Sequence, residues 1–303
     1  MKRKIISLLL AGIMTALAGC GNTGNGVSED STEAPGRETE QEDDAQTGQA
    51  ESGDAPAQAS SASVTEGTEE YRGFTLDNVL HSENNGDIHF NLYVPDSYDG
   101  SGPCAVFFTL PGYEGLYFQG AGENLYSENF GFEAQQYDPD MIIVAPQLSD
   151  WGDTSAEQTI ELTEYFLANY NIDPDRVYGE GYSGGGETMS RVMGKRPDLF
   201  TAYLQCSSRW DGSYEPVVQS RTPVYFVIGE DDEYYGSGPT REAYETLYSM
   251  YREEGMSDEE IQEVLVLDIK DADYFESQGV TVQHGGGNLF AADREIMGWL
   301  FGK

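Results

Sequence analysis

Short apolar runs alternate with longer amphipathic stretches along most of this chain. Residues 104–110 form a nearly continuous apolar run that stops at Pro111, and residues 141–145 form another that stops at Pro146. Runs of this length are typical of strands buried on both faces of a parallel sheet. Shorter apolar or alternating segments predict five further strands, at residues 88–94, 176–182, 200–206, 223–228 and 264–269.

Apolar residues at helical spacing separate these strands. Between residues 154 and 170, Ile160 and Phe166 belong to one apolar face, and Asp153 or Thr154 can cap the helix. Three further helices are predicted at residues 185–196, 240–254 and 289–301, and another helix is predicted to begin at Ser257. Residues 171–175 are predicted to form a loop. Strands that alternate with helices imply an α/β fold with a mostly parallel central sheet flanked by helices. Reactive groups are expected at the carboxyl ends of the parallel strands.

The amino terminus has a different pattern. Basic residues 2–4 precede an apolar run at residues 5–17, which is shorter than the roughly 20 residues that span a bilayer. A basic start followed by a short apolar stretch indicates a secretory signal. The run ends in Leu-Ala-Gly-Cys at residues 17–20, which resembles the lipobox of bacterial lipoproteins. This resemblance implies that residues 1–19 are removed and that Cys20 carries a lipid; an ordinary secretory signal with an incidental cysteine is the alternative.

Residues 20–70 are polar and acidic, with thirteen acidic residues against one basic residue, Arg37. Such a segment cannot bury enough apolar surface to offset its ordering entropy, so we expect a disordered tether. Its expected role is to hold one catalytic domain, residues 71–303, away from the outer face of the membrane that anchors Cys20. An acidic interaction arm is the alternative. The formal net charge of −38 makes nucleic acid and anionic membrane surfaces poor partners.

A glycine-rich motif, Gly181-Tyr182-Ser183-Gly184-Gly185, lies between a predicted strand and a predicted helix. It fits G-x-S-x-G, a turn that mounts a serine nucleophile. Gly181 and Gly185 form the elbow, because Cβ atoms would collide where the two backbones approach. Ser183 is the predicted nucleophile. The alternative is a serine in an ordinary glycine-rich turn.

Serine needs a base, and the chain has only three histidines, His81, His89 and His284. With this motif the usual chain order is serine, acid, histidine, so His284 alone qualifies. The acid should follow a strand between the serine and the histidine. The strand at residues 223–228 leads into four acids, residues 230–233, and a carboxylate there would orient the imidazole.

Acyl transfer also requires donors for an oxyanion. One is expected from the backbone N–H of Gly184, the residue after the nucleophile. The other is expected from the backbone N–H of Tyr113, in the loop after residues 104–110. A simple turn after that strand is the alternative.

Together these motifs resemble the α/β-hydrolase superfamily, and within it the polyhydroxybutyrate depolymerase and feruloyl esterase type and the prolyl-oligopeptidase-like serine hydrolases. The resemblance is carried by residues 92–95, 173–177, 181–185, 229–232 and 284–285. It implies an α/β-hydrolase fold and a serine–histidine–acid triad. Because the acid strand in these families ends Gly-x-x-Asp, it favours Asp232 over Asp231. One departure is Pro111-Gly112, where family members commonly have His-Gly.

Aromatic residues near these motifs bear on the substrate. Trp151, Tyr182 and Trp210 are predicted pocket walls, which suit an aryl or sugar-bearing ester; core packing is the alternative for each. No cofactor and no metal ion is expected. Cys104 and Cys206 lie in apolar runs, which favours two buried thiols over one disulfide.

The sequence therefore predicts a lipid-anchored serine esterase outside the cytoplasmic membrane, cleaving a small-molecule or polymeric ester through an acyl-enzyme. Two alternatives stay open. One is a serine peptidase that uses the same residues, and the other is a non-catalytic binding lipoprotein on the same scaffold.

Overall fold

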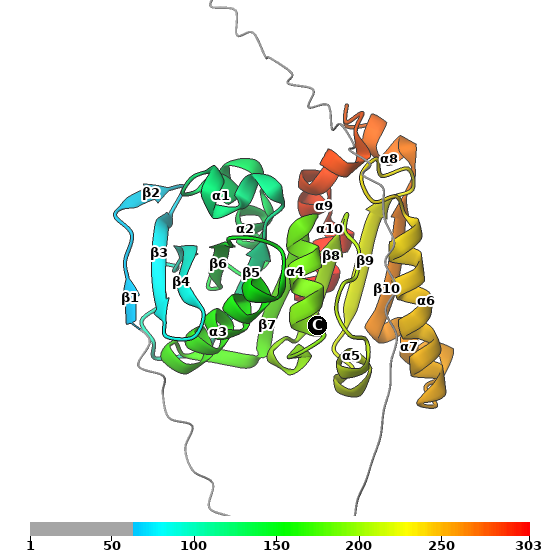
Figure 1. Ribbon diagram of the computed structural model, residues 1–303, viewed down its shortest axis with the longest axis horizontal. Coiled ribbons are helices and arrows are strands. Elements are labelled where there is room, and N and C mark those ends of the chain that lie inside the picture. The colour runs from blue at the N-terminus through cyan, green and yellow to red at the C-terminus, as the bar shows by residue number, and fades with distance from the viewer. Residues whose placement is uncertain (1–62) are drawn as a thin grey trace, which may run out of the picture. The chain divides into compact units, whose positions relative to one another are not determined.

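Ten strands form one mixed sheet at the centre of the computed structural model, which describes residues 63–303 (Figure 1). The strands are β1 (Ser63–Thr65), β2 (Glu69–Tyr71), β3 (Phe74–Ser82), β4 (Gly86–Tyr93), β5 (Cys104–Leu110), β6 (Ile142–Gln147), β7 (Ile172–Tyr182), β8 (Ala202–Cys206), β9 (Val224–Gly229) and β10 (Leu265–Lys270). Their order across the sheet is β1-β3-β4-β6-β5-β7-β8-β9-β10, with β2 paired to β3.

The six strands from β6 to β10 in this order run parallel, and β1 to β4 pair antiparallel at one side. The predicted α/β-hydrolase architecture with a mostly parallel sheet is confirmed. The sequence pattern did not indicate β3, because Asn78 interrupts its alternation of buried apolar residues. The Asn78 amide is satisfied locally, since it donates to the carbonyl oxygens of Thr75 and Phe90.

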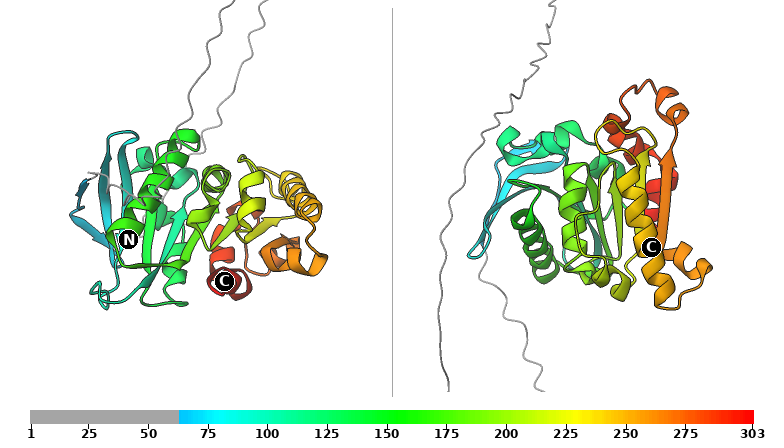
Figure 2. Two further views of the ribbon diagram at one scale, coloured as in Figure 1. Left: turned by 90° about the horizontal axis from the view of Figure 1, so that it is seen from below. Right: turned by 45° about the vertical axis from the view of Figure 1, so that its right-hand side comes forward.

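Helices cover both faces of this sheet (Figures 1 and 2). They are α1 (Glu123–Ser127), α2 (Phe130–Ala134), α3 (Asp153–Asn169), α4 (Gly184–Met193), α5 (Glu215–Ser220), α6 (Gly238–Glu253), α7 (Asp258–Val264), α8 (Ala272–Glu276), α9 (Gly287–Ala292) and α10 (Arg294–Phe301). Four short 3-10 turns are η1 (Tyr113–Gly115), η2 (Tyr117–Gln119), η3 (Pro197–Leu199) and η4 (Gln283–Gly286). The core under α3, α4 and α6 is separated by the sheet from the core under α2, α9 and α10.

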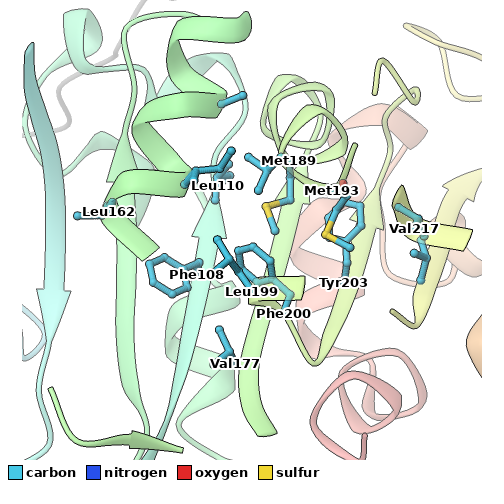
Figure 3. Close-up of a cluster of buried hydrophobic side chains, with 14 of the residues drawn as sticks. Phe108, Leu110, Leu162, Val177, Met189, Met193, Leu199, Phe200, Tyr203 and Val217 are labelled. Carbon is cyan, nitrogen blue, oxygen red and sulfur yellow. The ribbon is translucent and has the colours of Figure 1, made fainter. Parts of the chain in front are cut away.

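The continuous apolar run of β5 supplies both cores. Phe108 lies in the core under α4, and Phe107 lies in the core on the opposite face, each fully buried. Figure 3 shows Phe108 beside Phe200, with Met189 of α4 above them. Each such side chain contributes about 2 kcal/mol by leaving water, so β5 and α4 are held firmly at the point where the serine turn begins.

Several predicted boundaries differ from the structure. The loop predicted at residues 171–175 is wrong, because β7 already begins at Ile172 and pairs with Cys104. Neither predicted cap of α3 is used, since Gly152 is its N-cap without a side-chain bond. The closing helix is two helices, with Asp293 capping the second.

The predicted tether and anchor fall mostly outside the described residues. The signal at residues 1–19 and Cys20 lie there, but β1 and β2 lie within the segment predicted as tether, so ordered structure begins before residue 71. Cys104 and Cys206 are buried free thiols, as predicted. No helix within residues 63–303 is long and apolar enough to cross a membrane.

Candidate active site

Ser183 lies on a sharp turn between β7 and α4. Its backbone has φ 53° and ψ −123°, a region that residues with a Cβ rarely occupy. A Cβ on Gly181 would lie 2.6 Å from the carbonyl oxygen of Gly185, and one on Gly185 would lie 2.1 Å from that of Leu110. The turn therefore requires both predicted glycines, and it projects Ser183 beyond the carboxyl end of the sheet.

The three residues predicted as a triad meet above this turn. The Ser183 Oγ and the His284 Nε2 are 3.0 Å apart, and the His284 Nδ1 lies 2.9 Å from the Asp232 Oδ2. The second candidate acid, Asp231, is exposed, and its backbone N–H donates to the Gln283 side chain. The structure thus brings His284 together with Asp232.

Asp232 is buried yet well provided with donors. Its Oδ1 accepts the backbone N–H groups of Tyr234 at 3.0 Å and Tyr235 at 2.8 Å, while its Oδ2 faces His284. Burial alone favours the neutral carboxyl, but the bonds from His284 and from these two N–H groups outweigh it, and the pKa of Asp232 lies below its ordinary value. Asp232 is therefore a carboxylate at neutral pH.

Tyrosines hold and surround His284. The Tyr182 ring is nearly parallel to the imidazole at 5.8 Å, and its hydroxyl donates to the His284 carbonyl oxygen. Tyr234 lies 5.2 Å from the imidazole on centroids, and Tyr235 lies 5.5 Å away. Glu233 accepts the His284 backbone N–H at 3.0 Å. The sequence predicted Tyr182 as a pocket wall but none of these contacts with His284. The signal for Glu233, Tyr234 and Tyr235 was their position directly after the acid.

Two backbone N–H groups beside Ser183 make no hydrogen bond within residues 63–303. They belong to Gly184, at the start of α4, and to Tyr113, at the start of η1. A Cβ on Gly112 would lie 3.3 Å from the Ser183 Cβ, so the loop that carries Tyr113 passes directly beside the serine. Of the two predicted donors, Gly184 directly follows Ser183 in the chain, and Tyr113 directly follows the residue that passes beside it, which suits a site for an oxyanion.

The predicted pocket residues divide into two groups. Trp151 lies at the site, since a Cβ on Gly184 would lie 2.2 Å from its indole and the Tyr113 ring is 5.9 Å away. The prediction for Trp210 is wrong. Its side chain is buried, stacks on Tyr214 at 5.6 Å and donates its Nε1–H to a nearby carbonyl oxygen, because it completes the core beside α4.

A phenol–carboxylate pair also borders the serine. The Tyr235 hydroxyl donates to the Glu187 Oε1 at 2.7 Å, and Arg209 approaches the same oxygen at 3.4 Å. Burial and the Glu187 carboxylate raise the pKa of Tyr235. Within residues 63–303 no group of three His, Cys, Asp or Glu side chains is arranged to hold a metal ion.

Known structures share this fold. A thermostable esterase superposes with a TM-score of 0.60 at 20% sequence identity, over 76% of this chain and 62% of the esterase. Oligopeptidase B from Leishmania major superposes with a TM-score of 0.50 at 13% identity, over 75% of this chain and 37% of the oligopeptidase. The chain thus spans less than two thirds of either structure, and at these identities the likeness establishes the fold.

One family model matches the chain in sequence. The prolyl oligopeptidase family matches residues 148–253, a segment that contains Ser183 and Asp232. No curated protein sequence matches the chain. The partial family match and the superposed structures together establish the α/β-hydrolase fold of this chain.

Proposed function

We propose that this protein is a serine hydrolase, and more specifically an esterase that acts through Ser183, His284 and Asp232. The observation that carries the proposal is the continuous hydrogen-bonded chain from the Ser183 Oγ through the imidazole to the Asp232 carboxylate, with distances of 3.0 Å and 2.9 Å. This arrangement lets a weak nucleophile lose its proton as it attacks.

In the first half-reaction the Ser183 Oγ attacks the ester carbonyl carbon, and the His284 Nε2 takes the hydroxyl proton. The carbonyl oxygen becomes an oxyanion that accepts from the N–H groups of Gly184 and Tyr113. Collapse of this intermediate breaks the carbonyl–oxygen bond, and His284 gives its proton to the departing alcohol. The product that stays behind is an acyl ester of Ser183.

In the second half-reaction water attacks this acyl-enzyme while the His284 Nε2 takes a proton from the water. Collapse of the second intermediate returns that proton to Ser183 and releases the carboxylic acid. Asp232 stays ionised throughout, holds the imidazole tautomer and stabilises the imidazolium that forms twice in each cycle.

Aromatic rings that remain exposed around the serine support an aryl or sugar-bearing ester. Tyr113 is 50% exposed, Phe118 is 63% exposed and Tyr234 is 70% exposed. Tyr113 packs against Phe118 and Trp151 on the side of the 111–115 loop, and Tyr234 lies on the side of His284. Flat apolar surfaces on both sides suit a substrate with a ring in its acyl or alcohol part.

A peptidase is the second candidate, because the sequence match at residues 148–253 is to the prolyl oligopeptidase family. Both candidates share every step above and differ only in the bond that is cleaved. We also propose, from the residues of the amino terminus, that Cys20 is lipidated and that the catalytic domain works on the extracytoplasmic face of a membrane, held by an acidic tether.

The test compares the protein with its Ser183→Ala variant on p-nitrophenyl and feruloyl esters and on a panel of blocked peptides. We expect ester hydrolysis that falls by about 10⁵-fold or more in the variant, and labelling of Ser183 by a fluorophosphonate probe. Labelling of another residue would overturn the assignment of the nucleophile. Peptide cleavage with no ester cleavage would favour the peptidase.

A further inference from the structure

A buried carboxyl contacts the loop that carries Tyr113. Glu128, directly after α1, is only 8% exposed, and its Oε1 accepts the backbone N–H of Gly112 at 2.8 Å. Gly112 is both the neighbour of Tyr113 and the residue that passes beside Ser183. One carboxyl oxygen thus binds the part of the loop closest to the nucleophile.

This bond determines which N–H of the loop is free. The Gly112 N–H is taken by Glu128, and the Gly112 carbonyl oxygen accepts from Gly115 at 3.1 Å. The two peptide planes that flank Gly112 are therefore both held, Pro111–Gly112 by Glu128 and Gly112–Tyr113 by Gly115, and the N–H of Tyr113 is the one left without a partner among the described residues. Loss of the Glu128 bond would release the Pro111–Gly112 peptide plane, directly before the plane that carries the Tyr113 N–H, because no other group within residues 63–303 binds the Gly112 N–H.

Glu128 is itself held in place by the sheet. Its backbone N–H donates to the Asn124 carbonyl oxygen at 3.1 Å. The Asn124 amide donates to the carbonyl oxygens of Ala145 and Pro146 on β6, at 2.9 and 3.0 Å. The position of the Glu128 carboxyl is thus determined by β6, the strand beside β5. It does not depend on the loop that the carboxyl binds.

The surroundings of Glu128 oppose a negative charge. No Lys, Arg or His side chain within residues 63–303 forms an ion pair with it. The ionisable groups that act on it or feel its charge are Glu114 of η1, Glu180 and Tyr182 of β7, and Cys206 of β8. All of these are acids, and α9 contributes no ionisable side chain. Burial raises the pKa of Glu128 to about 8.

We propose that Glu128 is a positioning residue that orients the Tyr113 N–H toward the oxyanion and that it does so as a neutral, protonated carboxyl. Its ionisation would add a negative charge beside the place where negative charge develops, and hydrolysis would fall. The role assigned to Glu128 rests on the proposed function, since it presumes attack by Ser183.

The experiment measures kcat and KM from pH 6 to pH 10 for the wild type, Glu128→Gln and Glu128→Ala, with a p-nitrophenyl ester followed at the isosbestic wavelength of nitrophenol. We expect the wild-type kcat to fall with a midpoint near pH 8. Glu128→Gln should lose this fall, because its amide oxygen still accepts the Gly112 N–H but cannot become charged. Glu128→Ala should lower kcat by roughly 10- to 100-fold with little change in KM, and Glu128→Gln should lower it much less.

Controls separate the possible failures. Glu114→Gln removes an exposed carboxyl that lies in the same loop but makes no hydrogen bond to the loop backbone. The kcat of this variant should still fall at alkaline pH as it does in the wild type. An unchanged midpoint in Glu128→Gln, or equal losses of kcat in the Gln and Ala variants at pH 7, would overturn the role of Glu128. Retained activity in Ser183→Ala would instead overturn the proposed function. Thermal unfolding of each variant at pH 7 reports whether it is folded.

Discussion

Two buried carboxyl groups at the carboxyl end of this sheet differ in charge although both are removed from water. The Asp232 side chain, after β9, and the Glu180 side chain, on β7, are both 0% exposed. Asp232 accepts two backbone N–H groups and faces an imidazole. Glu180 accepts one hydroxyl, from Thr109 at 2.8 Å, and its Oε1 has no partner.

The difference shows that burial does not decide the charge of a carboxyl by itself. The donors around Asp232 keep the pKa of its carboxyl below the usual value, whereas burial and the nearby Glu128 carboxyl raise the pKa of Glu180 well above its usual value. The same end of the sheet therefore holds one carboxylate that can stabilise an imidazolium and a pair of neutral acids below the 111–115 loop.

Asp232→Asn, which changes the ionised carboxyl, should cause the largest loss of activity. The amide cannot accept the Nδ1–H of His284 in the same way and favours the wrong imidazole tautomer, so we expect kcat to fall by about 10⁴-fold with the fold intact. The measurement is steady-state hydrolysis of a p-nitrophenyl ester at pH 7. Asp231→Asn is the matched control, and a similar loss in that variant would mean that the acid is misassigned.

The sequence allowed one side of this comparison to be predicted and not the other. Ser183 could be predicted because its motif follows a strand, and His284 because it is the only histidine after Ser183 in the chain. The resemblance to known hydrolases favoured Asp232 among the four acids after β9. Glu128 and Glu180 gave no such signal, since their neutrality arises from burial among Gly112, Cys206 and each other, and those contacts join distant segments.

The exposure of individual side chains likewise could not be predicted from the sequence. Trp151 and Trp210 look alike in the chain, each near a motif, and only the packing of Trp210 against Tyr214 separates a core residue from one at the site. The parallel strands were predictable from their continuous apolar runs. The antiparallel strand β3 was not, because Asn78 is buried in a position that the alternation reserves for an apolar residue.

Glu180→Gln tests whether the Glu180 carboxyl is neutral in the folded protein, through the pH dependence of the free energy of unfolding. The folded-state pKa of Glu180 lies above its unfolded value, so as pH rises past that unfolded value the unfolded chain releases a proton that the folded protein keeps. That contribution is fully present below the unfolded pKa and is lost as pH rises, at about 1.4 kcal/mol per pH unit for one proton. The stability of the variant should therefore fall less than that of the wild type as pH rises from 6 to 8.

Urea unfolding at pH 6, 7 and 8 measures this slope. Glu245→Gln is the control, because Glu245 is exposed on α6 and its loss should leave the slope as in the wild type. A Glu180→Gln slope equal to that of the wild type would mean that Glu180 is already ionised in the folded protein.

Tyr235→Phe should have the smallest effect on activity, and it tests whether backbone donors alone keep Asp232 ionised. The variant keeps the backbone N–H that Asp232 accepts at 2.8 Å and the ring 5.5 Å from His284, and removes only the hydroxyl that binds Glu187. If backbone donors keep Asp232 ionised, kcat/KM should fall only a few-fold, which is the range of one side-chain hydrogen bond of about 1 kcal/mol. Tyr248→Phe, which breaks a phenol–carboxylate bond to Asp258 at the surface, is the matched control. A loss near that of Asp232→Asn would show instead that the Tyr235 hydroxyl takes part in the reaction at Ser183, since the backbone support of the carboxylate is the same in both proteins.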